Sequence, residues 1–239
     1  MRVVNFFFFA IVACCFMQGC SKDDVGSESP KVVYDDPLQD VDGNIYKTVK
    51  IGTQIWMAEN LRTTKYSDGT PIAEVSASPA WSELESGAYC AYNNDQTDVE
   101  IYGLLYNWYV VDDSRNACPD GWRVPTDEDM STLTNYLGGM QYAGGKLKES
   151  GLVHWSSPNS GAENLYGFAA LPAGARNSNG SFGSLMNDKG NYNGIWYNKK
   201  TGTMGWMLHI VYNDKGVSAS TFSAKTGCPA PGFCECPTV

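Results

Sequence analysis

The sequence predicts a single α+β domain made of short strands, two helices and long irregular loops. The 25 Gly among 239 residues and the low share of charged side chains, 18%, are typical of a fold rich in turns. Apolar side chains recur with helical spacing at two places, and short aromatic segments between Gly-, Asn- and Ser-rich stretches follow them. Seven Trp, fourteen Tyr and nine Phe supply enough packing material to exclude a disordered chain.

The charge balance excludes one class of function. The chain carries 26 acidic and 17 basic side chains, a formal net charge of −9. Nucleic-acid binders need a cationic surface to neutralise phosphates, so we expect no nucleic-acid partner.

The N-terminus has the pattern of a lipoprotein signal peptide, residues 1–19. Arg2 precedes an apolar run over residues 3–17 that only Asn5 interrupts. This run is shorter than the roughly 20 residues of a membrane-spanning helix but fits a signal peptide core. Gly19-Cys20 at its end resembles a bacterial lipobox, which implies cleavage before Cys20 and lipid on its thiol and amine. The alternative is an ordinary secretory signal that happens to end near a Cys.

Residues 20–40 are predicted to be the lipidated Cys and a flexible tether to a domain over residues 41–239. The first tether residues, Ser21, Lys22, Asp23 and Asp24, resemble the export signal of Bacteroidota surface lipoproteins. Removal of Arg2 with the signal peptide leaves 16 basic and 26 acidic groups, so the lipid rather than charge attraction must hold the chain on a membrane. We therefore expect a lipid-anchored outer-membrane protein exposed at the cell surface; the bland alternative for residues 21–24 is a solvated charged linker.

The first half of the domain opens with a hairpin. Asp42-Gly43-Asn44 is a turn, and residues 45–51 alternate so that Ile45, Val49 and Ile51 are predicted to share one face. Residues 52–54 turn the chain into a second strand at 55–57. Ser78-Pro79 predicts a short helix with Ser as its cap, and the apolar spacing over residues 101–111 predicts another helix.

The strongest local signal begins at Thr126. Its hydroxyl can cap a helix whose first turn, Asp127-Glu128-Asp129, suits the positive end of the helix dipole. The apolar side chains Met130, Leu133 and Leu137 then line one face, and Gly138-Gly139 ends the helix. Beyond it, short strands are expected at residues 167–169, 194–197 and 206–212.

Four phrases in the sequence carry a resemblance to a known family. They are residues 52–61 (GTQIWMAENL), 102–109 (YGLLYNWY), 118–126 (CPDGWRVPT) and 167–174 (GFAALPAG). In this order they resemble the Fibrobacter succinogenes major paralogous domain, which is common in surface lipoproteins of Bacteroidota, over about residues 41–225. The resemblance implies a C-type lectin-like fold with small twisted antiparallel sheets, two helices and a long loop region where ligands sit. The family has no established biochemical activity.

The chain departs from that family at its end. The family closes on an Arg-Cys strand, whereas here residues 221–228 run into a Cys- and Pro-rich tail. Formylglycine-generating enzymes share the implied fold and use two late cysteines, but the pair in this chain lies beyond the expected last strand, which argues against that activity.

Five cysteines remain after signal removal and lipidation, and export permits disulfides among them. We suggest two disulfides, one between Cys90 and Cys118 and one between Cys228 and either Cys234 or Cys236. The connectivity itself cannot be read from the sequence. A metal or redox role for Cys234-Glu235-Cys236 is the alternative to a stapled or frayed tail. No metal site is predicted.

Candidate ligand contacts are aromatic. Side chains in or beside Gly-, Asn- and Ser-rich segments could stack on sugar rings, with structural packing as the alternative; they are Trp81, Trp155, Tyr192, Trp196 and Tyr197. The acidic segments 95–100 and 112–113 could hold calcium, but they lack EF-hand spacing and fit solvated loops better. His209 lies in an apolar strand and is expected to pack there, and no nucleophile or metalloprotease motif accompanies either histidine.

These observations favour a surface lipoprotein without catalytic activity that binds a glycan, a host-matrix component or an envelope protein. No cofactor is expected, with structural calcium as the exception left open. Two alternatives stand: an enzyme or accessory subunit in extracellular polysaccharide processing, and a structural component of the envelope or of fimbriae.

Overall fold

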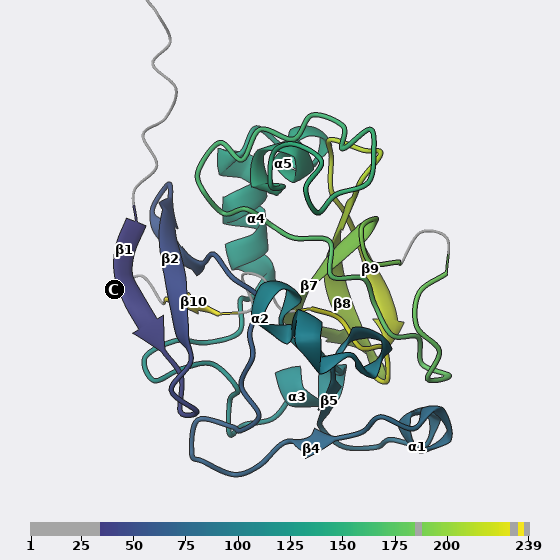
Figure 1. The fold of residues 1–239 in the computed structure, drawn as a ribbon. Coiled ribbons are helices and arrows are strands. Elements are labelled where there is room, and N and C mark those ends of the chain that lie inside the picture. The colour runs from purple at the N-terminus through teal and green to yellow at the C-terminus, as the bar shows by residue number, and fades with distance from the viewer. Residues whose placement is uncertain (1–33, 185–187, 230–233, 237–239) are drawn as a thin grey trace, which may run out of the picture.

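The computed structural model describes residues 34–184, 188–229 and 234–236, drawn in Figure 1. The predicted signal peptide, the predicted lipidation site Cys20 and the predicted export signal Ser21, Lys22, Asp23 and Asp24 lie outside these residues. Within the described part no helix is long and apolar enough to cross a membrane.

The predicted opening hairpin is confirmed, and it is part of a larger sheet. Strands β2 (Ile45–Ile51) and β3 (Gln54–Met57) pair antiparallel, with β1 (Tyr34–Gln39) on one side and β10 (Glu235–Cys236) on the other. The tether prediction was therefore too long, because residues 34–39 form an edge strand. The carboxylate of Asp40 closes the turn to β2 by accepting hydrogen bonds from the backbone N of Asp42 and from the hydroxyl of Tyr46.

Both faces of β2 bury side chains, so burial does not simply alternate along the strand. Ile45 is 61% exposed, whereas Tyr46 is buried with Met57 and Tyr106 in one hydrophobic cluster. Val49 and Ile51 are buried in a second cluster. The strand therefore lies between two cores.

The second layer consists of short elements. Strands β4 (Ala73–Glu74), β5 (Ala88–Cys90) and β6 (Leu105–Tyr106) form a small sheet in that order. The predicted helix at Ser78 is confirmed as α1 (Ser78–Ser82), although Ala77 is its N-cap and the Ser78 hydroxyl donates to the carbonyl of Gly180. Two 3₁₀ turns, Tyr92–Asn94 and Gln96–Asp98, lead into the next helix.

The helix predicted over residues 101–111 does not form. The chain makes α2 (Val99–Tyr102), then β6, then α3 (Trp108–Val111). Gly103 separates them with φ 69° and ψ −166°, a conformation essentially restricted to glycine. A tertiary contact explains the break, because Gly103 packs directly on Asn60.

The helix predicted after Thr126 is confirmed as α4 (Asp127–Tyr136). Thr126 and Asp129 form a reciprocal capping box, and Met130 and Leu133 are buried. A further helix, α5 (Met140–Leu147), follows directly after Gly138-Gly139 and was not predicted. Its inner face includes Gly144 and Gly145, which lie against the backbones of Gly216 and Gly161, so apolar periodicity could not reveal it.

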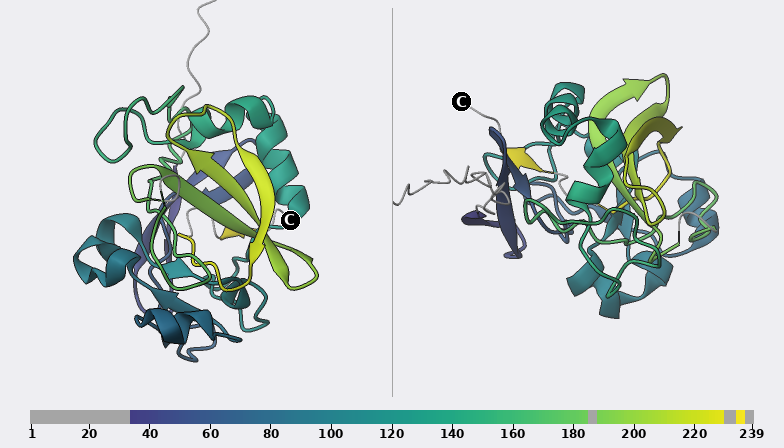
Figure 2. Two further views of the ribbon diagram at one scale, coloured as in Figure 1. Left: turned by 90° about the vertical axis from the view of Figure 1, so that its right-hand side faces the viewer. Right: turned by 90° about the horizontal axis from the view of Figure 1, so that it is seen from above.

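The last sheet confirms two of the three expected late strands. It is formed by β7 (Tyr192–Thr201), β8 (Met204–Val211) and β9 (Ser218–Ser223), in that order and antiparallel. Residues 167–169 are not a strand, because Ala169 has a positive φ of 49°. Seen from above in Figure 2, the β1–β2–β3 sheet lies at one end and the β7–β8–β9 sheet toward the other, with α4 and α5 between them. The second hydrophobic cluster joins all three, from Val49 through Leu133 to Leu208.

The cysteine pairings expected from the sequence are wrong. Cys118 is bonded to Cys234, across 116 residues. This disulfide fixes the C-terminal strand β10 beside β3, where Glu235 pairs with Trp56. Cys90 and Cys228 are buried free thiols instead, and burial raises the pKa of both. The tail is therefore stapled into the fold at Cys234.

Removal of the disulfide should destabilise the domain. A Cys118→Ala/Cys234→Ala double variant is expected to lose about 2–5 kcal/mol of unfolding free energy, because the unfolded chain regains the freedom of a long closed loop. Guanidinium unfolding with and without reductant measures this. The parent should be weakened by reductant and the variant should not; equal stability of both oxidised proteins would contradict the prediction.

Glu235 should make stability depend on pH. Its carboxyl is buried and lies 3.1 Å from the guanidinium of Arg123, and burial raises its pKa to about 7. Between about 4.5 and 7 the folded chain therefore holds a proton that the unfolded chain has released, so stability falls as pH rises through this window. Glu235→Gln is expected to melt at a higher temperature than the parent at pH 8 and to lose this advantage at pH 5. An equal difference in melting temperature between variant and parent at pH 5 and at pH 8 would contradict the prediction.

Candidate functional site

The five aromatic residues predicted to contact a ligand are all core residues. Trp81, Trp155, Tyr192, Trp196 and Tyr197 are each 3% exposed or less. The three indole N–H groups donate to backbone carbonyls, of Lys225, Ala170 and Tyr106 respectively. None of the five rings offers a face to a ligand in this structure, so the stacking interpretation is wrong and the packing interpretation holds. Their Gly-rich surroundings are loops that wrap around the rings.

The acidic segments are occupied by ion pairs. Asp98 pairs with Lys189, Asp112 with Lys200, and Asp113 with Arg115. In the part of the chain that the structure describes, no group of three or more His, Cys, Asp or Glu side chains is arranged to hold a metal ion.

His209 packs in β8 as expected. Its ring bonds to the hydroxyls of Tyr192 and Ser220, and burial lowers its pKa to about 4. His154 lies elsewhere, in the loop after α5, where its Nδ1 contacts both oxygens of Glu149 at 2.9 Å.

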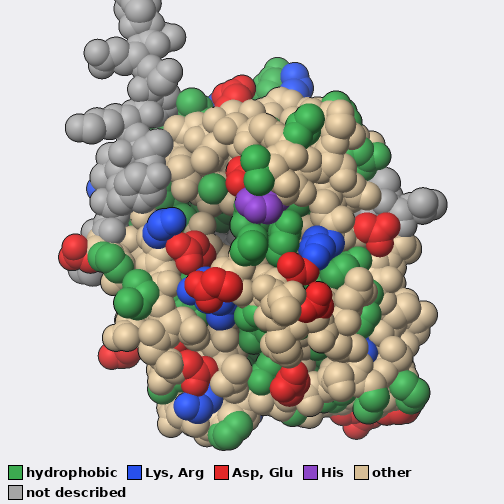
Figure 3. All heavy atoms as spheres, in the orientation of Figure 1, with side chains coloured by type: hydrophobic (Ala, Val, Ile, Leu, Met, Phe, Trp, Pro, Cys, Tyr) green, Lys and Arg blue, Asp and Glu red, His purple; other side chains and the backbone are tan. Residues whose placement is uncertain are grey.

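A polar hollow of about 410 Å³ lies on the face shown in Figure 3, where acidic, basic and histidine side chains gather. We call it the central pocket. Its volume is within the roughly 300–1,000 Å³ of small-molecule sites. Its lining comes from β2, the segment after β3, α2, the segment just after α5 and the loop over residues 164–171. The residues are Lys47, Ala58, Glu59, Asn60, Arg62, Glu100, Ile101, Glu149, Asn164, Gly167, Ala169 and Leu171.

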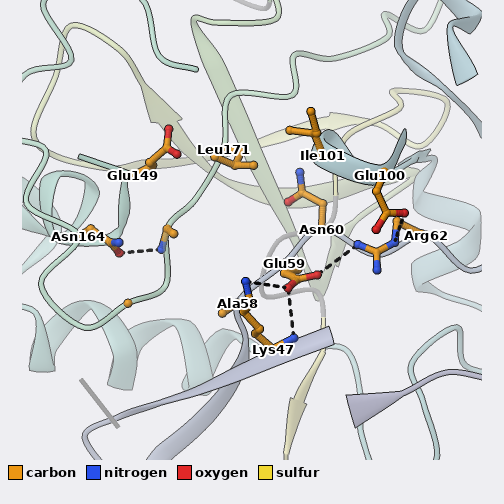
Figure 4. Close-up of a pocket in the computed structure, with 12 residues that line it drawn as sticks. Lys47, Ala58, Glu59, Asn60, Arg62, Glu100, Ile101, Glu149, Asn164 and Leu171 are labelled. Atoms are coloured by element: carbon orange, nitrogen blue, oxygen red, sulfur yellow. Dashed lines mark hydrogen bonds and ion pairs between the residues drawn. The ribbon is translucent and has the colours of Figure 1, made fainter. Parts of the chain in front are cut away.

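Charged side chains on one side of the pocket form a connected network, shown in Figure 4. Glu59 contacts the guanidinium of Arg62 at 3.2 Å and Lys47 at 3.8 Å. The Arg62 side chain is only 10% exposed, and its other terminal nitrogen donates to the carbonyl of Ile45. Its guanidinium also lies 4.7 Å from the centre of the Tyr46 ring. The position of Arg62 is therefore fixed by groups outside the pocket.

The amide of Asn60 is fixed in the same way. Asn60 is 4% exposed, and its Nδ2 donates to the carbonyl of Tyr102 at 2.6 Å. Gly103 allows this contact, because a Cβ there would lie 2.4 Å from the Cβ of Asn60. The break between α2 and β6 at Gly103 thus makes room for Asn60 and for its hydrogen bond to Tyr102.

The opposite wall is a loop with unusual backbone geometry. Asn164, Gly167 and Ala169 all line the pocket and all have positive φ values. The Oδ1 of Asn164 accepts a hydrogen bond from the N of Ala169 at 2.8 Å and so holds the wall in this conformation. Strained backbone of this kind clusters at ligand sites, because the surrounding structure must over-determine it.

The sequence analysis did not single out the central pocket. Its lining residues are of ordinary types, and only the fold brings residues 59, 100 and 149 to the lining of one pocket. One signal was present: Ala58, Glu59 and Asn60 belong to the phrase at 52–61, and Gly167, Ala169 and Leu171 to the phrase at 167–174. Two of the four phrases that carry the family resemblance therefore meet at this pocket.

Comparison with known proteins gives one match. A family model described as the Fibrobacter succinogenes major domain matches residues 49–226. Neither a search of curated proteins nor a search of solved structures found a match.

Gly103→Ala should damage both the fold and the pocket. A Cβ would force a glycine-only conformation and would overlap Asn60, so we expect a loss of about 1–3 kcal/mol in unfolding free energy. Gly69→Ala is the matched control, because Gly69 also has a positive φ but no atom lies within 4 Å of the place that a Cβ would take. Thermal unfolding of both variants separates the effects. A Gly103→Ala protein no less stable than the Gly69→Ala protein would show that the contact with Asn60 is unimportant.

Proposed function

The chain belongs to the Fibrobacter succinogenes major domain family, and we propose that it is a surface-exposed outer-membrane lipoprotein that binds a glycan, without catalysis, in the central pocket. The observation that carries the proposal is the pairing of Glu59 with Arg62 beside the oriented amide of Asn60 in one hollow. The family itself adds no activity.

Support for the location comes from the sequence alone. A short apolar run after Arg2, a Cys at its end and the Ser-Lys-Asp-Asp that follows are the features of an exported, lipidated and surface-directed chain. The lipid on Cys20 is the proposed membrane contact.

We extend the proposal to the fold family. The proposal of a C-type lectin-like domain is supported by the small, mainly antiparallel sheets, by α4 and α5, which pack in one core, and by the long loops. The phrase Arg123-Val124-Pro125-Thr126 leads directly into α4. In such a domain a loop-lined pocket is the natural ligand site.

Hydroxyl groups match the central pocket chemically. A hydroxyl donates one hydrogen bond and accepts two, so it can bridge a carboxylate and a guanidinium that lie side by side. Glu59 and Arg62 present such a pair at 3.2 Å, and bonds to charged groups are the stronger kind. Vicinal hydroxyls of a sugar repeat this pattern along one edge.

The charges of the pocket favour a neutral ligand over an ionic one. Lys47 and Arg62 are matched by Glu59 and Glu100, and the carboxylate of Glu149 is held by the Nδ1 of His154 at 2.9 Å. A fully ionic ligand would have to break these pairs. A neutral polyhydroxyl ligand can bind while leaving them intact.

One observation favours the enzymatic alternative. Glu59, Glu100 and Glu149 all line the same pocket, and glycoside cleavage uses two carboxyl groups. Binding can be distinguished from cleavage by measuring whether the bound glycan is shortened.

The test is a glycan array with the full-length protein in detergent. We expect reproducible binding that Glu59→Gln weakens at least tenfold, because it removes the carboxylate charge to which a sugar hydroxyl donates, while Glu128→Gln on the exposed first turn of α4 changes nothing. Shortening of a bound oligosaccharide that Glu149→Gln abolishes would replace the binding proposal by the enzymatic one. Absence of binding to any glycan would overturn it.

A further inference from the structure

Asn60 leaves one hydrogen-bond acceptor open in the central pocket. The side chain is almost completely buried, and its Nδ2 is engaged by the carbonyl of Tyr102. Its Oδ1 has no hydrogen-bond partner among the described residues. In Figure 4 this oxygen is turned toward the open middle of the pocket. Because the amide cannot rotate without losing the Tyr102 bond, the pocket presents a fixed acceptor that needs a donor.

Two apolar side chains line the same pocket as this acceptor. Ile101 and Leu171 both line the pocket, and Figure 4 shows them together on the same side of Asn60. Ile101 is 49% exposed although it is a large aliphatic residue. They give the pocket an apolar corner beside a hydrogen-bond acceptor.

A donor without a hydrogen-bond partner completes the set. The Nε–H of Arg62 makes no hydrogen bond to a described residue. Its nearest ion-pair partner, Glu100 Oε2, is 3.8 Å away, beyond hydrogen-bond distance, and the Glu100 side chain is 85% exposed. Glu100 is therefore not held at Arg62 by a hydrogen bond, and a ligand oxygen that takes its place would give the buried Nε–H a partner.

Resting on the proposed function, we propose that the central pocket recognises the acetamido group of an N-acetylated amino sugar. That group carries an N–H donor, a carbonyl acceptor and a methyl group within one planar unit. The N–H donates to Asn60 Oδ1, the methyl packs against Ile101 and Leu171, and the carbonyl accepts from Arg62 Nε–H. The donor, the acceptor and the methyl group of the acetamido unit thus each contact a pocket group that the described residues leave available.

Other sugar substituents fit this corner less well. A hydroxyl can donate to Asn60, but it has no apolar part to cover Ile101 and Leu171. A free amine is protonated at neutral pH, and contact with two aliphatic side chains would remove water from its charge. The pocket should therefore discriminate among sugars that differ only at this substituent.

The experiment is calorimetric titration of the full-length protein in detergent with three trisaccharides of the same linkage. Their units are N-acetylglucosamine, glucosamine and glucose. We expect the N-acetylated trisaccharide to bind at least tenfold more tightly than the other two. A trisaccharide of N-acetylgalactosamine should bind about as tightly as that of N-acetylglucosamine if the acetamido group alone is recognised.

Ile101→Ser tests the apolar corner, because an exposed side chain can be changed without unfolding the domain. It should reduce the preference for the N-acetylated sugar severalfold, whereas Val41→Ser, at another exposed aliphatic position, should not. Equal binding of all three trisaccharides, unchanged in Ile101→Ser, would overturn the acetamido proposal and leave glycan binding intact. Binding of none of these sugars, nor of any other glycan on the array, would overturn both.

Discussion

The structure depends on one constraint: the buried backbone carbonyls of its long loops need hydrogen-bond donors. A domain with so few regular elements buries loop peptide groups that no helix or sheet can pair. Lys148, fully buried, donates from its Nζ to the carbonyls of Ser160, Val211 and Asp214. Arg176, also fully buried, donates to those of Val75, Ser76 and Gly180. Burial lowers the pKa of Lys148 to about 8, which is the cost of using a cation for this purpose.

The wall of the central pocket is fixed by the same device. Consecutive residues 169, 170 and 171 each have a backbone group held by a side chain: Asn164 accepts from the N of Ala169, Trp155 donates to the carbonyl of Ala170, and Asn193 donates to that of Leu171. Two of these three side chains, Trp155 and Asn193, are buried, and they hold the backbone of a loop whose other groups line the pocket. Trp155, which the sequence suggested as a ligand contact, supports the site without facing it.

Local signals in the sequence predicted what short-range interactions decide. The capping box at Thr126 and the hairpin at 45–57 are complete within about a dozen residues, and both are present. The failures all have long-range causes. The helix over 101–111 is broken by contact with Asn60, and the pairing of Cys118 depends on where a strand 116 residues later lies. The pocket escaped prediction for the same reason, because its chemistry arises from ordinary residues that meet only in the folded chain.

A pocket built in this way suits recognition by hydrogen-bond pattern. Arg62 and Asn60 are oriented by backbone carbonyls outside the cavity, so a ligand does not have to order them, and less affinity is lost to side-chain entropy. Because Lys47 and Arg62 are already paired with Glu59 and Glu100, an anion finds no unpaired cation in the pocket. Discrimination among ligands then depends on three groups that are not used within the described part of the chain: the acceptor of Asn60, the Nε–H donor of Arg62 and the apolar corner. Unpaired polar groups of this kind discriminate strongly, since a ligand that lacks the matching group leaves them desolvated.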